Sequence, residues 1–209
     1  MGILRSLPLL LLPLSITTMA RPVSWPDGKT IMQRNSFQES RLHVHYSTNA
    51  FNSFGVAFED SHQLDYTYAG LQWNRLLKRR NTRYSQANLY LRSQLGVLRN
   101  AGSDRLAGTI GISADWETRR YFTSYAANYR EADNLDEFNF SQQARIGIAP
   151  YIAEYGNWHT WLMLQLDHQR DREDELTLTP MVRLFRSNYL FEFGISENED
   201  LMFNWVVRY

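Results

Sequence analysis

The chain has 209 residues, of which 44% are hydrophobic, 14% aromatic and 21% charged, and its formal net charge at pH 7 is zero. This composition excludes a disordered tail, and the lack of a basic excess means that no nucleic-acid partner is expected. Because the sequence contains no cysteine, disulfides and thiolate metal sites are also excluded.

Residues 1–20 have the features of a secretory signal peptide. Arg5 precedes an apolar run over residues 7–14, and small and polar residues then lead to Ala20. A membrane anchor is the weaker alternative, because the run is short and contains Pro8 and Pro13. We therefore expect an exported protein with a signal peptide at 1–20 and a single domain at 21–209.

From residue 28 onward, apolar residues recur at every second position, which is the period of strands with one apolar and one polar face. The pattern predicts an all-β protein with twelve strands. Ten strands is the alternative, because the first is short and residues 119–130 do not reveal their apolar face. The predicted ranges are 28–34, 40–48, 53–60, 63–75, 85–97, 107–116, 119–130, 139–152, 159–168, 175–185, 189–196 and 201–209.

The last predicted strand places Phe203, Trp205, Val207 and Tyr209 on one face, with Tyr209 as the final residue. This ending resembles the terminal strand of bacterial outer-membrane β-barrels, which closes the barrel and is read by the assembly machinery in that family. The resemblance implies that these four residues form an assembly signal and that the barrel-assembly machinery is a partner. An edge strand of a soluble protein that ends in tyrosine by chance is the alternative.

Charge is also sorted between the ends of the predicted strands, if they run alternately up and down from a periplasmic N-terminus. Acidic loops beside phosphate-rich lipopolysaccharide would need bridging divalent cations, the only cofactors expected. The acids expected in the outer loops are Glu59, Asp60, Asp104, Glu131, Asp133, Asp136, Glu137, Asp171, Glu173, Asp174, Glu175, Glu197, Glu199 and Asp200. The bases expected in the periplasmic turns are Arg75, Lys78, Arg79, Arg80, Arg83, Arg119, Arg120 and Arg186.

Taken together, the signal peptide, the alternating segments and the aromatic ending resemble small Gram-negative outer-membrane barrels. In size and strand count the chain looks most like narrow, twelve-stranded, monomeric channels for acidic oligosaccharides, which line their pore with arginines. The resemblance implies a transmembrane antiparallel β-barrel over residues 21–209 in the bacterial outer membrane. It also implies contact with membrane lipids and lipopolysaccharide, and it favours a monomer.

Charged side chains of both signs fall on the polar faces of the strands, which face inward in such a barrel. Two functions follow: a small channel for hydrophilic solutes or ions, or a closed structural barrel whose lumen charges pair and whose acidic loops bind cations or a partner. Most tyrosines and tryptophans, Tyr66, Tyr68 and Trp161 among them, are expected in interfacial girdles. A sugar-stacking platform is the alternative for whichever of Trp158 and Trp161 faces inward. The residues predicted to line the lumen are Arg41, His43, His45, Asp65, Arg92, Asp115, Arg145, Asp167, Arg183, Glu192 and Arg208.

Catalytic and metal-binding patterns are weak. His45 and Ser47 share a face and faintly resemble the His-x-Ser arrangement of outer-membrane phospholipase A, which makes a lipid hydrolase a third alternative. In that family the dyad faces lipid, whereas this face is polar, so no enzyme is expected. His43 and His45 would stand about 7 Å apart and could share a metal only with a third ligand from another strand.

Overall fold

The computed structural model describes residues 21–133, 139–154, 156–169 and 176–209, so the predicted signal peptide lies outside the described residues. Within these ranges no helix is long and apolar enough to span a membrane. The described chain forms twelve β-strands, as predicted. They are β1 (Lys29–Ser36), β2 (Glu39–Ser47), β3 (Asn52–Ser61), β4 (Tyr66–Asn81), β5 (Ser85–Asn100), β6 (Ser103–Thr118), β7 (Tyr121–Ala132), β8 (Asn139–Ile148), β9 (His159–Gln169), β10 (Leu176–Arg186), β11 (Tyr189–Ile195) and β12 (Leu201–Arg208).

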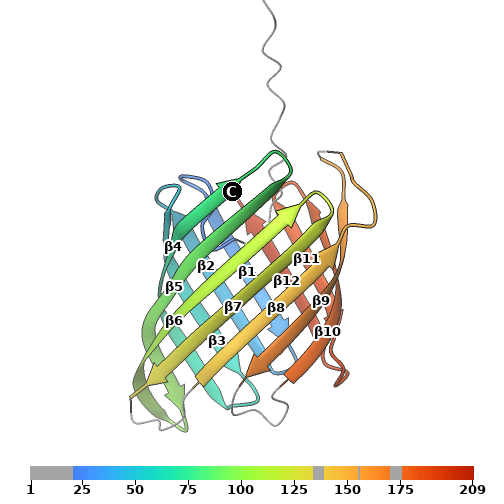
Figure 1. Ribbon diagram of the computed structural model, residues 1–209. Helices are drawn as coiled ribbons and strands as arrows, with labels where there is room; N and C mark the ends of the chain where they lie inside the picture. The colour runs from blue at the N-terminus through green and yellow to red at the C-terminus, as the bar shows by residue number, and fades with distance from the viewer. Residues whose placement is uncertain (1–20, 134–138, 155, 170–175) are drawn as a thin grey trace, which may run out of the picture.

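Each strand pairs antiparallel with its neighbours in sequence, and β1 pairs with β12 to close the barrel (Figure 1). At this seam the Lys29 N–H donates to the Tyr209 carbonyl at 3.0 Å, and the Tyr209 N–H donates to the Lys29 carbonyl at 2.9 Å. Both residues therefore lie at one end of the barrel, which we call the terminal end. The fold is an all-β, closed, twelve-stranded antiparallel barrel, which confirms the prediction.

Side chains alternate between the lumen and the outer surface along every strand, as the pleat requires. In β12, Asn204 and Val206 are buried inside the barrel, whereas Phe203 is 40% exposed on the outside. Trp205, Val207 and Tyr209 continue the outward row of the predicted assembly signal. The outer surface carries many large exposed hydrophobic side chains, which water alone does not favour.

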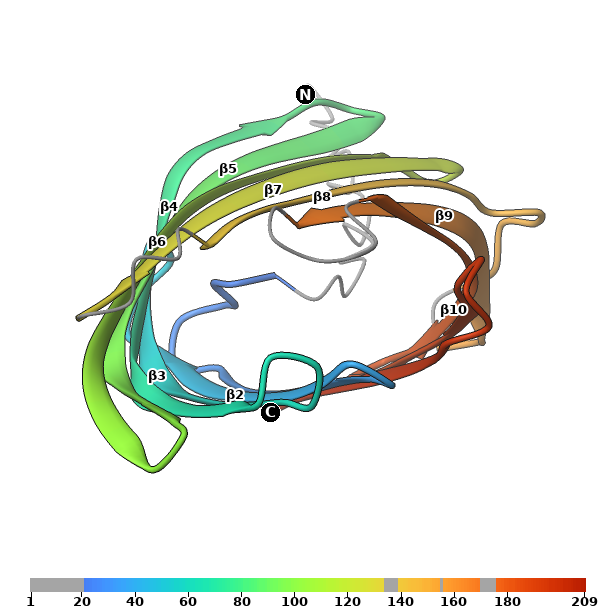
Figure 2. The same cartoon turned by 90° about the horizontal axis from the view of Figure 1, so that it is seen from below.

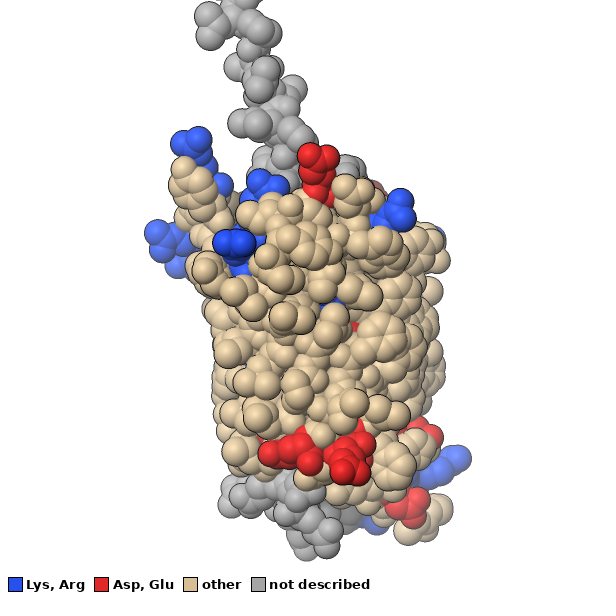
Figure 3. Space-filling view, turned by 90° about the vertical axis from the view of Figure 1, so that its right-hand side faces the viewer, with Lys and Arg blue, Asp and Glu red and all other residues tan. Residues whose placement is uncertain are grey.

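On the face shown in Figure 3, basic side chains predominate at one end of the barrel and acidic side chains at the other, with a band almost free of charge between them. Arg75, Lys78, Arg80 and Arg83 belong to the β4–β5 hairpin at the terminal end. The other end, which we call the acidic end, carries the turns that join β1 to β2, β3 to β4, β5 to β6 and β11 to β12. The acids predicted for the outer loops that lie at the acidic end are Asp60, Asp104, Glu131, Asp133, Glu197, Glu199 and Asp200.

Glu59 was expected in an outer loop, but it lies inside the barrel on β3 with 7% of its surface exposed, so that prediction is wrong. The remaining predicted loop acids lie outside the described residues: Asp136, Glu137, Asp171, Glu173, Asp174 and Glu175.

Candidate functional site: the charged lumen

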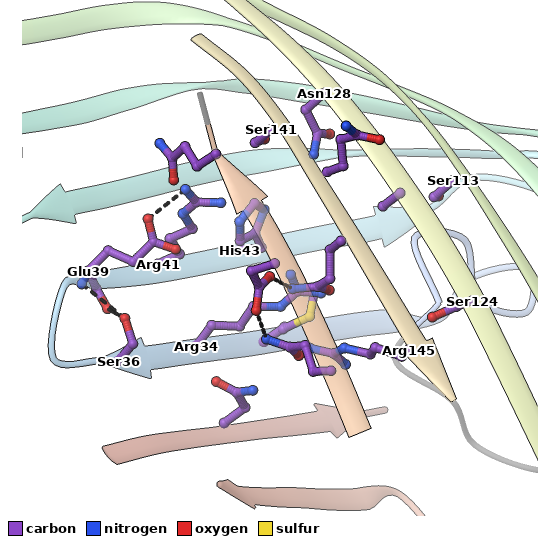
Figure 4. A pocket seen from close by; sticks show the side chains of 18 of the residues that line it. Arg34, Ser36, Glu39, Arg41, His43, Ser113, Ser124, Asn128, Ser141 and Arg145 are labelled. Atoms are coloured by element: carbon purple, nitrogen blue, oxygen red, sulfur yellow. Dashed lines mark hydrogen bonds and ion pairs between the residues drawn. The ribbon is translucent and has the colours of Figure 1, made fainter. Parts of the chain in front are cut away.

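The lumen holds a cavity of about 270 Å³. Arg34 on β1, Arg41 and His43 on β2, and Arg145 on β8 point into it from opposite walls (Figure 4). Side chains two positions apart on a strand point to the same face. Each of these residues therefore lies on the inward face of its strand, together with the residues two positions before and after it. The lumen is therefore a polar space, lined by charged side chains of both signs, inside an apolar shell.

One group of charged residues surrounds Glu59, near the acidic end. Its carboxylate accepts hydrogen bonds from Arg130 at 2.7 Å and from the Tyr66 hydroxyl at 2.6 Å, and it lies 3.1 Å from the Arg41 guanidinium. Arg41 also pairs with Glu39 at 2.7 Å. Because Arg130 reaches Glu59 from β7 on the other side of β4, β5 and β6, this group links two parts of the wall that are not adjacent.

A second group surrounds Glu192, which is 3% exposed. Its carboxylate accepts hydrogen bonds from Arg183 at 2.6 Å, Asn204 at 2.8 Å and Arg145 at 3.3 Å. Arg183 also lies over the Phe122 ring, with its guanidinium carbon 5.0 Å from the ring centroid. One carboxylate thus serves two guanidiniums, so the group carries an excess positive charge.

Arg34 and Arg92 differ from the other arginines that line the cavity. Both line the cavity, and neither forms an ion pair with a carboxylate of the described residues. Arg34 lies within electrostatic reach of the guanidiniums of Arg41, Arg92 and Arg145 and of the Glu192 carboxylate. The lumen therefore holds two guanidinium groups, those of Arg34 and Arg92, that have no ion-pair partner among the described residues.

Two other acidic side chains of the lumen accept hydrogen bonds from amides. Asp167 accepts a hydrogen bond from Gln143 at 2.7 Å and another from Gln165, and Asp115 accepts one from Asn88 at 2.7 Å. These amides fix the positions of the carboxylates without neutralising them. Both signs of charge therefore line the cavity.

Towards the terminal end, the side of the lumen formed by β7 to β12 and β1 becomes apolar. Trp161 is 5% exposed and meets Phe122 edge-on, with ring centroids 6.4 Å apart. Trp161 is therefore not part of an interfacial girdle, and neither are Tyr66 and Tyr68, which are 7% and 2% exposed inside the barrel. Those girdle predictions are wrong, because the strand face, and not the residue type, decides which way an aromatic side chain points. The buried apolar cluster consists of Met32, Phe122, Ala149, Trp161, Met163, Met181, Phe185, Leu190 and Val206.

Most of the predicted lumen residues occupy inward positions on their strands. Asp65 is the exception: it lies in the turn between β3 and β4, exposed and with a φ of 50°, so its placement in the lumen is wrong. The prediction continued the strand alternation into this turn, but a residue with a positive φ interrupts the two-residue period there. The predicted residues that the structure places inside the barrel are Arg41, His43, His45, Arg92, Asp115, Arg145, Asp167, Arg183, Glu192 and Arg208.

The sequence analysis missed Arg34, Glu59 and Arg130 as lumen residues. Arg34 ends the first predicted strand, and its inward direction follows from the outward position of Gln33 opposite Leu42. Arg130 belongs to the segment whose apolar face was not resolved. There the signal is the row of small residues Ser124 and Ala126, which face the cavity beside the exposed Tyr125.

The histidines do not form a catalytic or metal site with their predicted partners. His45 is 2% exposed, and neither ring nitrogen has a hydrogen-bond partner among the described residues, so it does not bond to Ser47. The Ser47 hydroxyl instead accepts a hydrogen bond from the Ser24 N–H at 2.9 Å. His43 bonds to Gln72 at 2.6 Å, and within the described ranges no three histidine or acidic side chains are grouped to hold a metal.

No family model and no curated protein sequence matches the chain. Among solved structures, a KdgM porin in complex with disordered oligogalacturonate matches with a TM-score of 0.49 and 8% identity, over 87% of this chain and 98% of that chain. A second KdgM porin structure matches with a TM-score of 0.46 and 9% identity, over 87% and 98%. LpxR from Salmonella typhimurium matches with a TM-score of 0.43 and 8% identity, over 87% and 99%. At such identities the likeness is one of fold alone.

Proposed function

We propose that the protein is a barrel of the bacterial outer membrane that passes small hydrophilic solutes or ions, with a preference for anions. The observation that carries this proposal is the presence of two cavity-lining guanidiniums, Arg34 and Arg92, that form no ion pair with a carboxylate of the described residues. A pore lined by unpaired guanidiniums attracts anions and repels cations. The surplus positive charge around Glu192 acts in the same direction.

The location in a membrane is supported by the outer surface. Leu71 is 70% exposed, Leu95 59% and Ile110 55%, and all three lie on the outward face of neighbouring strands. Such a surface is costly in water and favourable in lipid. The nearly uncharged band of the outer surface in Figure 3 lies between the basic terminal end and the acidic end.

The preference for anions is tested by replacing Arg34 and Arg92 together with glutamine. We expect the ratio of anion to cation permeability in planar bilayers to fall by about a factor of two to ten, because the local positive potential is lost. Arg99→Gln is the matched control, since Arg99 pairs with Asp104 in an exposed hairpin outside the cavity. An unchanged ratio in the double variant would refute the assigned role of these arginines.

The membrane location is tested by an arginine scan along the outward face of β4. Leu71→Arg should destabilise the folded barrel in lipid by about 2–4 kcal/mol, and Thr67→Arg by at most about 1 kcal/mol, because charge is costly near the bilayer midplane and tolerated at its edge. Thr67 lies opposite Asp60 and Arg99, near the acidic end. Equal costs for the two variants, measured by urea titration in vesicles, would argue against a lipid-facing surface.

A closed barrel with a structural or binding role is the second candidate. The ion pairs around Glu59 and Glu192 link strands that are not adjacent. They would stiffen the wall of a barrel through which no solute passes. In this alternative, the acidic end binds divalent cations that bridge it to lipopolysaccharide. A folded, silent barrel in planar bilayers would favour it.

A further inference from the structure

The chain that precedes β1 does not leave the barrel directly. From Lys29 at the terminal end, residues 21–28 turn back and run inside the ring of strands (Figure 2). Val23 is 1% exposed, and Arg21 and Ser24 are 9% exposed. We call residues 21–28 the N-terminal segment. Its first four residues lie enclosed by the barrel wall, whereas residues 25–27 are exposed.

Three small polar side chains of neighbouring strands hold the backbone of the N-terminal segment. The Ser53 hydroxyl donates to the Pro22 carbonyl at 2.6 Å, and the Asn74 amide donates to the same carbonyl at 3.4 Å. The Ser24 N–H donates to the Ser47 hydroxyl at 2.9 Å. Ser47, Ser53 and Asn74 are inward residues of β2, β3 and β4, and each is at most 1% exposed.

An ion pair and an apolar contact also hold the N-terminal segment inside the lumen. Arg21 forms an ion pair with Glu117 of β6, which is itself 3% exposed. Val23 packs in a buried cluster with Leu76 of β4 and Tyr90 of β5. The segment thus contacts the wall from β2 to β6.

The opposite side of the lumen near the terminal end is occupied by apolar side chains. Phe122, Trp161 and Phe185 belong to the apolar cluster contributed by β7 to β12 and β1. Pro22 lines the cavity together with Phe122, so the N-terminal segment and the aromatic cluster both border the cavity towards the terminal end. The arginine-lined cavity therefore meets the N-terminal segment on its way to this end.

We propose that the N-terminal segment is an internal plug that limits passage through the terminal half of the lumen. The inference rests on the proposed channel function and adds its regulation. Among the described residues, the backbone–backbone hydrogen bonds from this segment to β2 are confined to Asp27 and Gly28, which pair with Ser47. Residues 21–26 can therefore leave the lumen without breaking the sheet. If cleavage follows Ala20 as predicted, Arg21 is the first residue of the plug.

The plug is tested by single-channel recording of three forms of the purified protein: unchanged, lacking residues 22–25, and carrying Glu117→Gln. We expect the deletion to raise single-channel conductance at least threefold. Glu117→Gln keeps the volume of the side chain and removes the ion pair with Arg21, so it should increase the time spent at the high-conductance level. Heat-modifiable migration in gels checks that each form is folded.

The chain has no cysteine, so a single introduced thiol reports the position of the segment without any current. Val23→Cys should react with a water-soluble maleimide at least ten times more slowly than an exposed control, Tyr84→Cys, and Glu117→Gln should speed its reaction. Tyr84 is 73% exposed in the β4–β5 turn at the same end.

The outcomes separate the two proposals. Conductance that is already present and does not change on deletion overturns the plug and leaves the channel intact. Silence of all three folded forms overturns the channel and the plug with it. Fast labelling of Val23→Cys in the otherwise unchanged barrel overturns the plug whatever the current shows.

Discussion

Replacing Gly55 with alanine is expected to destabilise the barrel by more than about 3 kcal/mol, at the upper end of the usual cost of overpacking. Gly55 faces the lumen on β3 beside His45 of β2. A Cβ atom at this position would lie 2.0 Å from the Val44 carbonyl oxygen and 2.6 Å from the His45 Cα. Both contacts involve backbone, so no side-chain rotation relieves them. Urea titration of the folded barrel in lipid vesicles measures the loss.

Gly108 provides the matched control. It lies within β6, and an added Cβ there would meet its nearest heavy atom at 3.9 Å, an ordinary van der Waals distance. Gly108→Ala should therefore leave the unfolding midpoint almost unchanged. If Gly55→Ala were tolerated equally well, the close approach of β2 and β3 would not exist in the folded protein.

The strand order could be predicted from the sequence because the barrel imposes one requirement on every strand. Its outer face must be apolar and its inner face can be polar, so the alternation continues from β1 to β12 with little interruption. Strand ends were less well predicted. The segment expected to end at residue 97 continues as β5 to Asn100, because polar residues pair as well as apolar ones in a hairpin.

The contacts inside the lumen could not be predicted in the same way. Arg130 and Glu59 are 71 residues apart and belong to strands that do not touch, so their pairing depends on the diameter and tilt of the closed barrel. Periodicity assigns a face to each residue, but not a height along the axis. The contact of Tyr66 was missed for a related reason. Its place near a strand end is typical of a girdle residue, but its hydroxyl donates a hydrogen bond to Glu59 inside the barrel.

The N-terminal segment was also beyond the reach of periodicity. Residues 21–28 have no alternation, and nothing in Arg21 or Val23 alone indicates burial. Their environment is created by Glu117, Leu76 and Tyr90, which come from three other strands. Only the closed barrel brings these groups together.

Replacing Glu192 with alanine is expected to cost about 3–5 kcal/mol, because it leaves buried guanidiniums without their counter-charge. The side chains of Glu192 and Arg183 are each 4% exposed, and that of Arg145 is 7% exposed. Asn204 would lose its acceptor as well. The two arginines would repel each other across the space left by the carboxylate. The measurement is the urea midpoint of the folded barrel in vesicles.

Two further variants decide whether the loss at Glu192 comes from charge or from packing. Glu192→Gln keeps the size of the side chain and a hydrogen-bond acceptor, so it should retain part of the stability while the excess positive charge of the lumen increases. Asp104→Asn should have no measurable effect, because its ion pair with Arg99 is exposed and screened by water. If Glu192→Ala and Asp104→Asn had the same small effect, water in the lumen would be compensating the charges around Glu192, and the lumen would be wide and hydrated at this level.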